Sequence, residues 1–169
     1  MCLIQTERLQ LQQISLKDAP FYVQLFNTEA WLKYIGDRNV RSVSQAEAYI
    51  EKNYLPSYKK HGYGAYTVKL KETGQTIGAC GLYKRDSLEY PDIGFSFLTE
   101  YIGKGYGFEA ASAVLEYARD VLGLNTILGV TVSYNTASIK LLEKLGLRQK
   151  GTFTFHNDPE ELLLFQIKY

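Results

Sequence analysis

Hydrophobic and polar residues alternate with a period of two, typical of half-buried β-strands, in several parts of the chain. Residues 4–14 carry the first example, with Leu9 and Leu11 between polar neighbours. Further β-rich runs lie at 63–70, 76–83, 92–98, 126–132, 150–155 and 161–168. The sequences KETGQ and HNDP have the turn residues of hairpins, so the second and third runs and the last two runs are predicted to pair.

Other segments repeat their apolar residues with the period of a helix. Ser15 and Ser44 each precede an acidic residue by three positions, a capping signal, and predict two helices after the first strand. A longer helix, ending before Gly123, follows the loop TEYIGKGYG, and a last helix runs through SIKLLEKL to Gly146. The apolar face of the longer helix is Ala111, Val114, Leu115, Ala118 and Leu122.

Composition predicts one compact domain over residues 1–169, because 46% hydrophobic and 22% charged residues are ordinary fractions for a globular chain. The net charge of +1 argues against a nucleic-acid partner. No apolar run reaches the roughly 20 residues of a membrane span, and no signal peptide is evident. We therefore expect a cytoplasmic protein without a membrane partner.

The two cysteines and two histidines exclude two further classes of protein. Only two cysteines occur, Cys2 at the terminus and Cys80 inside an apolar run, so neither a disulfide framework nor a zinc site is encoded. His61 and His156 lack the close spacing of metal ligands. No metal cofactor is expected.

A glycine-rich loop joins the 92–98 strand to the longer helix. Its residues are Gly103, Lys104, Gly105, Tyr106 and Gly107. The backbone N–H groups at a helix start lack partners within the helix and attract anions, and glycine lets a phosphate approach them. The spacing is not that of a Walker A loop, and Phe108 stands where the dinucleotide fingerprint needs glycine.

These motifs resemble the Gcn5-related N-acetyltransferase (GNAT) superfamily over the whole chain: IGKGYGFEAA after DIGFSFL, then YNTASIKLLEKLGL. TERLQL, WLKYIGDRNV and GYGFEA further resemble its RimJ/RimL-type branch, which acetylates ribosomal-protein N-termini, along with the many relatives of that branch that act on small molecules. Ile102 departs from the Gln or Arg of the family loop. The resemblance implies an α/β (α+β) fold, with a mixed, mostly antiparallel sheet of about six to seven strands flanked by about four helices.

The resemblance also implies the co-substrate acetyl-CoA and the residues that hold it. The pyrophosphate would lie on the amides of Gly103, Lys104, Gly105, Tyr106, Gly107 and Phe108. The pantetheine would lie along Phe97, Leu98 and Thr99 like an added strand. Asn135 resembles the Asn that bonds the pantetheine, and its alternative role is to cap the last long helix; the two roles can coexist.

Acetyl transfer to an amine needs a base, an oxyanion donor and an acid for the departing thiolate. Asp92 lies at a position where several family members have a Glu that acts as the base. Its alternative role is that of a solvated acid at the end of the strand. The N–H of Leu98 is the expected oxyanion donor. Ser138 lies where RimJ/RimL-type enzymes have a serine near the sulfur, so it is the candidate acid. Its alternative role is a hydrogen bond to the backbone at the start of its own helix. Leu142 replaces the usual Tyr acid, and Glu109 is expected to have a structural role.

The expected function is transfer of an acetyl group from acetyl-CoA to a primary amine, either a protein N-terminal α-amine or a small-molecule amine. Aromatic residues could wall the acceptor site, although such residues are more often core: Trp31, Tyr34, Tyr49, Tyr63, Tyr66 and Phe95. Lys84 and Arg85 could meet an acidic substrate or be solvated. The rival hypothesis is a catalytically weak acyl-CoA-binding module, and the chain is expected to be a monomer or homodimer.

Overall fold

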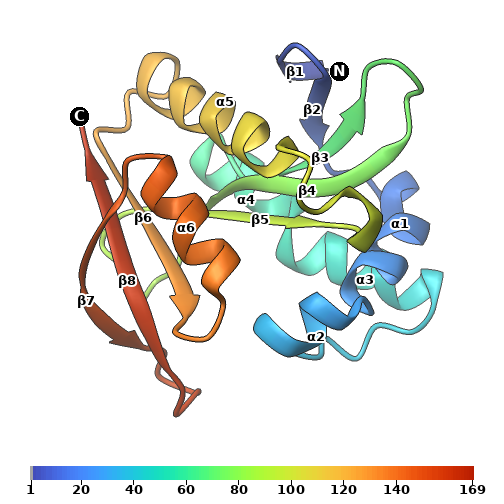
Figure 1. The fold of residues 1–169 in the computed structure, drawn as a ribbon. Coiled ribbons are helices and arrows are strands. Elements are labelled where there is room, and N and C mark those ends of the chain that lie inside the picture. Colours follow the sequence, from blue (N-terminus) through green and yellow to red (C-terminus); the bar gives the residue numbers. More distant parts are fainter. Residues whose placement is uncertain (1) are drawn as a thin grey trace.

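The computed structural model describes residues 2–169 and contains one eight-stranded sheet with helices on both faces (Figure 1). The strands are β1 (Cys2–Gln5), β2 (Leu9–Gln13), β3 (Ala65–Leu70), β4 (Thr76–Tyr83), β5 (Asp92–Phe97), β6 (Thr126–Val132), β7 (Arg148–Thr154) and β8 (Glu161–Lys168). The helices are α1 (Ala19–Phe26), α2 (Glu29–Tyr34), α3 (Val43–Asn53), α4 (Leu55–His61), α5 (Tyr106–Asp120) and α6 (Thr136–Lys144), with short 3₁₀ turns η1 (Leu16–Asp18) and η2 (Thr99–Tyr101).

The strand order is β1-β2-β3-β4-β5-β6-β8-β7, and every neighbouring pair is antiparallel except β5 and β6. The mixed, mostly antiparallel sheet expected from the sequence is therefore confirmed. Helices α5 and α6 cover one face, where α5 packs on β4 and β5, and the helices between β2 and β3 cover the other face (Figure 1). Each face has its own hydrophobic core, one centred on α5 and the other on α1 and α3.

The strand predicted over 4–14 is wrong as one element, because the chain turns back within it. The N–H of Thr6 donates to the carbonyl of Leu9 at 3.0 Å, and β1 and β2 pair antiparallel around this turn. The alternation of polar and apolar residues continues through the turn and conceals it. The sheet consequently has eight strands instead of six or seven.

The region between β2 and β3 also differs from the prediction of two helices. Among the described residues it forms four short α-helices, two of which have proline in their first turn, where a missing N–H costs nothing. The helix start expected at Ser44 lies two residues earlier. Ser42 caps α3 by accepting a hydrogen bond from the N–H of Gln45 at 3.1 Å.

Two features of residues 2–169 concern membranes and metals. No helix among them combines the length and apolar character needed to cross a bilayer. Within the same residues, no group of three or more His, Cys, Asp or Glu side chains is close enough together to hold a metal ion.

Candidate active site

The glycine loop has the backbone shape that an anion site at a helix start requires. Gly103 and Gly105 have φ of +79° and +84°, values that side chains rarely allow, and Gly105 is the N-cap of α5. A Cβ on Gly103 would meet no atom within 4 Å, so the space before the loop is open. The loop residues from Ile102 to Gly105 are exposed. The open loop at the positive end of a 15-residue helix therefore fits a diphosphate.

The central strands β5 and β6 are parallel but separate soon after they meet. They pair at Asp92 and Leu128, and the Leu128 N–H donates to the Pro91 carbonyl at 2.8 Å. Residues 94–96 are half-buried although β5 is a central strand. We call this opening between β5 and β6 the splay; it is closed at Asp92 and open toward the glycine loop.

Backbone hydrogen bonding indicates which groups of β5 face the splay. The N–H of Leu98 donates to the carbonyl of Ile77 at 2.9 Å, so Leu98 bonds to β4. Residues of an antiparallel strand alternate in the side to which they bond, so Phe95 and Phe97 direct their N–H and C=O groups toward β6. Pro91, which has the same parity, does bond to β6.

The alternation corrects the expected role of the Leu98 N–H, and the end of β5 at Phe97 bears on the expected contact of Thr99. The N–H of Leu98 is engaged within the sheet, so it is not placed to serve an oxyanion. Thr99 lies beyond the end of β5 in η2 and is exposed, so it does not extend the strand. The groups available for an added strand are those of Phe97, as expected, and of Phe95, which the sequence suggested only as a cleft wall.

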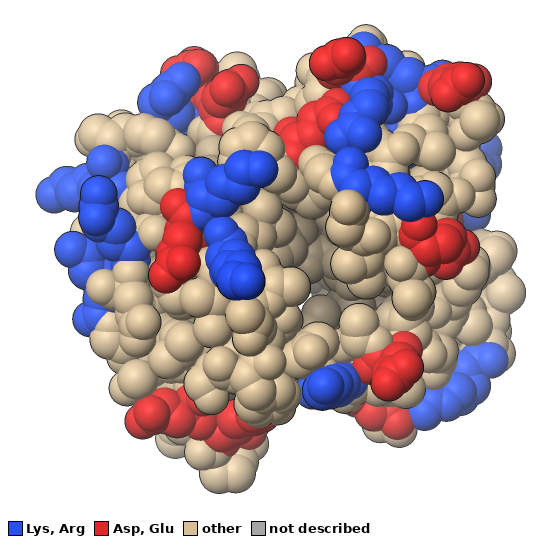
Figure 2. All heavy atoms as spheres, viewed as in Figure 1, with Lys and Arg blue, Asp and Glu red and all other residues tan. Residues whose placement is uncertain are grey.

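The molecular surface is hollowed between α6 and the start of α5 (Figure 2). Basic side chains lie on both sides of this hollow, over α6 and near the glycine loop (Figure 2). Lys140 and Lys144 are exposed on α6, and Lys104 is exposed in the loop. Lys144 Nζ lies 4.2 Å from the ring centroid of Phe108, which links the two sides. A polyanionic ligand would meet positive charge on both sides of the hollow.

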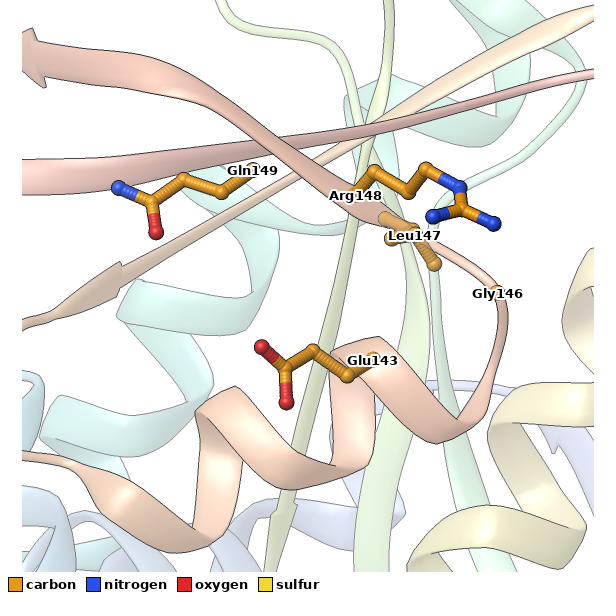
Figure 3. Close-up of a pocket in the computed structure, with 5 residues that line it drawn as sticks. All are labelled: Glu143, Gly146, Leu147, Arg148 and Gln149. Atoms are coloured by element: carbon orange, nitrogen blue, oxygen red, sulfur yellow. The ribbon is translucent and has the colours of Figure 1, made fainter.

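A separate pocket lies at the other end of α6 (Figure 3). Its lining residues are Glu143, Gly146, Leu147, Arg148 and Gln149, which come from the end of α6 and the start of β7. The side chains of Glu143 and Gln149 extend toward the same side of the view, and that of Arg148 extends toward the other side (Figure 3). This pocket is therefore distinct from the splay and contains none of the expected site residues.

Asp92, the expected base, is neither solvated nor free. Its side chain is 2% exposed, and its oxygens accept hydrogen bonds from Nε and Nη2 of Arg85 at 2.9 and 3.4 Å. Burial raises the pKa of Asp92, and the charge of Arg85 opposes that shift. The ring centroid of Phe155, from the β7–β8 hairpin, lies 5.1 Å from the Arg85 guanidinium carbon. The ion pair joins three parts of the chain at the closed end of the splay.

Glu109 has the structural role expected of it, through partners that the sequence did not indicate. Its carboxylate accepts hydrogen bonds from the Thr6 hydroxyl at 2.6 Å and from the N–H of Arg8 at 2.8 Å. Arg8 Nε also donates to it, at 2.7 Å. The turn between β1 and β2 is thereby attached to the first turns of α5.

The start of α6 brings Asn135 and Ser138 together. The side chain of Asn135 accepts a hydrogen bond from the N–H of Ser138 at 3.2 Å, so the capping alternative for Asn135 is confirmed. Ser138 is half-buried beside this cap. Leu142 is 1% exposed, and its side chain covers Gly129 of β6. Leu142 is thus a core residue, and a tyrosine there would need to displace that packing.

The aromatic candidates divide between the core and the splay. Trp31, Tyr63 and Tyr66 are 7%, 7% and 0% exposed, as their core alternative predicted. Tyr34 of α2 lies 6.0 Å from Tyr134, centroid to centroid, where Tyr134 follows the open end of β6. The aromatic wall at the open end is therefore Tyr34 with Tyr134, a partner that the sequence did not indicate.

Lys84 donates to the carbonyls of Arg85 and Leu88 and is not simply solvated.

Comparison with known proteins identifies the family to which this splay and loop belong. The family described as "Acetyltransferase (GNAT) domain" matches residues 8–148. The chain belongs to the GNAT acetyltransferase family. An uncharacterized N-acetyltransferase, p20 from Bacillus licheniformis, is 31% identical over 86% of this chain and 82% of its own. YoaA from Bacillus subtilis, also an uncharacterized N-acetyltransferase, is 29% identical over 88% and 84% of the two chains.

Solved structures of GNAT proteins share the complete fold. An acetyltransferase from Agrobacterium tumefaciens superposes with a TM-score of 0.83 at 25% identity, over 100% of this chain and 95% of its own. The chain is therefore an N-acetyltransferase with the GNAT fold. GNAT acetyltransferases use acetyl-CoA, and the glycine loop and the splay described above have the chemistry to hold its diphosphate and its amide-containing arm.

Proposed function

We propose that this GNAT enzyme transfers the acetyl group of acetyl-CoA directly to an α-amino group, at a peptide N-terminus or on a small molecule. One observation carries the proposal: the open splay between β5 and β6 leads to a glycine loop with two positive-φ residues at the N-terminus of α5. Such a site offers backbone donors to a diphosphate at one end and to an extended amide chain along β5.

The donor side uses backbone groups more than side chains. The amides of residues 103–108 would hold the diphosphate, and the N–H and C=O groups of Phe95 and Phe97 would bond the pantetheine. The bound coenzyme supplies an acetyl thioester, which an amine can attack. The N–H of Phe97 or Phe95 replaces that of Leu98 as the oxyanion donor, because the Leu98 N–H is bonded to Ile77.

We infer the class of acceptor from the burial of Asp92 and its ion pair with Arg85. The carboxylate is bonded to Arg85 and buried, so it is not placed to accept a proton from a bound ammonium group. An alkyl ammonium has a pKa of about 10.4, whereas an α-ammonium has one of about 7.7–8.0. A site in which Asp92 is not free to act as a base suits the α-amine, because a large fraction of that amine is already neutral near pH 8.

A resemblance in sequence supports the same acceptor class. TERLQL and GYGFEA resemble the RimJ/RimL-type branch, which acts on protein N-termini. The fold does not choose the acceptor, because Vibrio cholerae proteins named for ribosomal-protein-serine and for spermidine acetylation both share it, with TM-scores of 0.78 at 21% and 18% identity. We assign the chain to that branch as part of the proposal.

Acetylation of matched peptides tests the acceptor class. One peptide has a free N-terminus and no lysine, and its control has a blocked N-terminus and one lysine. We expect product from the first peptide only, with kcat/KM rising through about pH 8 as the α-amine loses its proton. Preferential acetylation of the lysine peptide, or of polyamines, would contradict the α-amine assignment while leaving acetyl transfer intact.

Ser138→Ala is expected to lower kcat by about 10- to 100-fold, the range for loss of one positioned proton donor. The hydroxyl is the candidate donor to the departing thiolate. Because Asn135 caps the helix through the N–H of residue 138, which alanine retains, the melting temperature should change little. A variant with wild-type kcat would make Ser138 only a helix-start residue.

Asp92→Asn is expected to lower kcat by less than about 10-fold, because the account gives Asp92 a structural role. If Asp92 were the base, the loss would instead be about 100-fold or more and would shrink as the pH rises. Steady-state rates between pH 6 and pH 9 distinguish the two roles. A large, pH-dependent loss would return Asp92 to the catalytic residues.

A further inference from the structure

The turn between β1 and β2 lies against the glycine loop, although Arg8 and Lys104, which are in contact, are 96 positions apart in sequence. Three donors of this turn converge on one carboxylate: the Thr6 hydroxyl, the Arg8 N–H and Arg8 Nε all bond Glu109. Glu109 lies in the first turns of α5, directly after the loop. The turn is thus fixed in position at the place where the coenzyme diphosphate is proposed to bind.

The guanidinium of Arg8 continues from Glu109 across the loop itself. Nη1 donates to the carbonyl of Lys104 at 3.2 Å, and the guanidinium carbon lies 4.3 Å from the ring centroid of Tyr106. Nη2 lies 3.3 Å from the position that a Cβ on Gly105 would occupy. Arg8 therefore contacts consecutive parts of the loop, from Lys104 to Tyr106.

The bond to Lys104 controls the direction of a donor. The C=O of one residue and the N–H of the next belong to one planar peptide unit and point in opposite directions. By holding the Lys104 carbonyl on its own side, Arg8 turns the N–H of Gly105 to the opposite side. Lys104 and Gly105 are at the centre of the loop, so this orientation bears directly on its ability to hold an anion.

Arg8 also compensates a negative charge next to the anion site. Burial alone would raise the pKa of Glu109, but hydrogen bonds from Thr6 and from the N–H and guanidinium of Arg8 lower it, so the carboxylate is ionised at neutral pH. An uncompensated carboxylate one helical turn from a diphosphate would repel it. The paired guanidinium, whose side chain is 43% exposed, offsets that repulsion.

We propose that Arg8 is a positioning residue for the coenzyme: it orients the Lys104–Gly105 peptide and neutralises Glu109, so that the loop binds the diphosphate of CoA. This inference rests on the proposed acetyl-CoA donor. It assigns a function to the TERLQL segment, which the donor and acceptor sites described above do not use.

The test compares Arg8→Gln with Arg119→Gln. Arg119 lies near the other end of α5, has a side chain 44% exposed, and bonds Asp120 at 2.7 Å, so it matches Arg8 in exposure and pairing. We expect Arg8→Gln to raise the Kd of CoA in calorimetry, and the KM of acetyl-CoA, by about 10-fold with kcat nearly unchanged. Arg119→Gln should leave both constants at wild-type values.

Two further measurements separate positioning from a general effect on the fold. S-acetylpantetheine has no phosphate, so its kcat/KM should be the same in wild type and Arg8→Gln. Adding Glu109→Gln to Arg8→Gln should recover part of the CoA affinity, because it removes the uncompensated charge. A thermal melt checks that each variant is folded, and Arg8→Lys, which retains the charge, should lose less affinity than Arg8→Gln.

If the wild type binds CoA tightly and Arg8→Gln has the same Kd, the inference about Arg8 is wrong and the proposed donor still stands. Equal losses with acetyl-CoA and S-acetylpantetheine would also overturn the inference about Arg8, because a merely structural role affects both donors. Failure of the wild type to bind CoA would overturn the proposed donor and this inference together.

Discussion

Gly105→Val is expected to raise the Kd of CoA by more than about 100-fold while the chain remains folded. Residue 105 has φ of +84°, a conformation that costs a β-branched residue about 1–3 kcal/mol, so the loop would change shape to relieve the strain. The new Cβ would also lie 3.3 Å from Arg8 Nη2. Calorimetric titration with CoA and a thermal melt measure the two effects separately.

Gly123→Val provides a matched control at the other end of α5. Gly123 is exposed, has φ of +69°, and a Cβ there would meet no atom within 4 Å. The substitution introduces similar backbone strain away from the loop, so CoA affinity should be unchanged. If both variants bind CoA like the wild type, the glycine loop is not the diphosphate site.

Arg85→Leu is expected to lower the free energy of unfolding by about 3 kcal/mol near pH 8, because it leaves the buried carboxylate of Asp92 without its partner. Arg41 provides the control, since its pair with Asp37 has both side chains about half exposed, at 53% and 44%. Arg41→Leu should leave the unfolding free energy nearly unchanged. Urea denaturation measures both variants.

The effect of Arg85→Leu should depend on pH in a direction fixed by Asp92. Burial already raises the pKa of Asp92 in the folded chain, and removing Arg85 raises it further. The folded state then binds a proton more tightly than the unfolded state, so stability falls as the pH rises from the unfolded to the folded pKa. The loss should be smaller at pH 5 than at pH 8.

Adding Asp92→Asn to Arg85→Leu should restore part of the stability at pH 8, since the amide carries no charge to desolvate. A pH-independent loss, with no recovery from the second substitution, would show that Arg85 stabilises the chain by packing against Phe155 and not through Asp92.

Features encoded by neighbouring residues could be predicted from the sequence. The loop at Gly103 and Gly105, the hairpin at Gly74 and the cap at Asn135 each depend on a few adjacent positions, and each has the expected local structure. Backbone sterics and capping act over this short range. The turn at residues 6–8 is one local feature that was missed, because apolar residues flank it with strand-like spacing.

Features that depend on register or on distant contacts could not be predicted. Whether the N–H of Leu98 or that of Phe97 faces the splay follows from the pairing of β5 with β4, which no local pattern encodes. The hydrogen bonds of Glu109 with Thr6 and Arg8 join residues that are more than 100 positions apart in the sequence. The partner of Asp92 is Arg85 in the preceding loop, which the sequence offered as a contact for an acidic substrate or as a solvated residue.

Amine-dependent release of CoA from acetyl-CoA tests the central claim most directly. The wild type is assayed by thiol release with peptides bearing free α-amines, small α-amines and polyamines, with Gly105→Val as the negative control and mass spectrometry to locate the acetyl group. The account predicts release with at least one α-amine, an acetylated product, and neither with Gly105→Val. Tight CoA binding without amine-dependent release from any acceptor would contradict it and would favour an acyl-CoA-binding module that does not turn over.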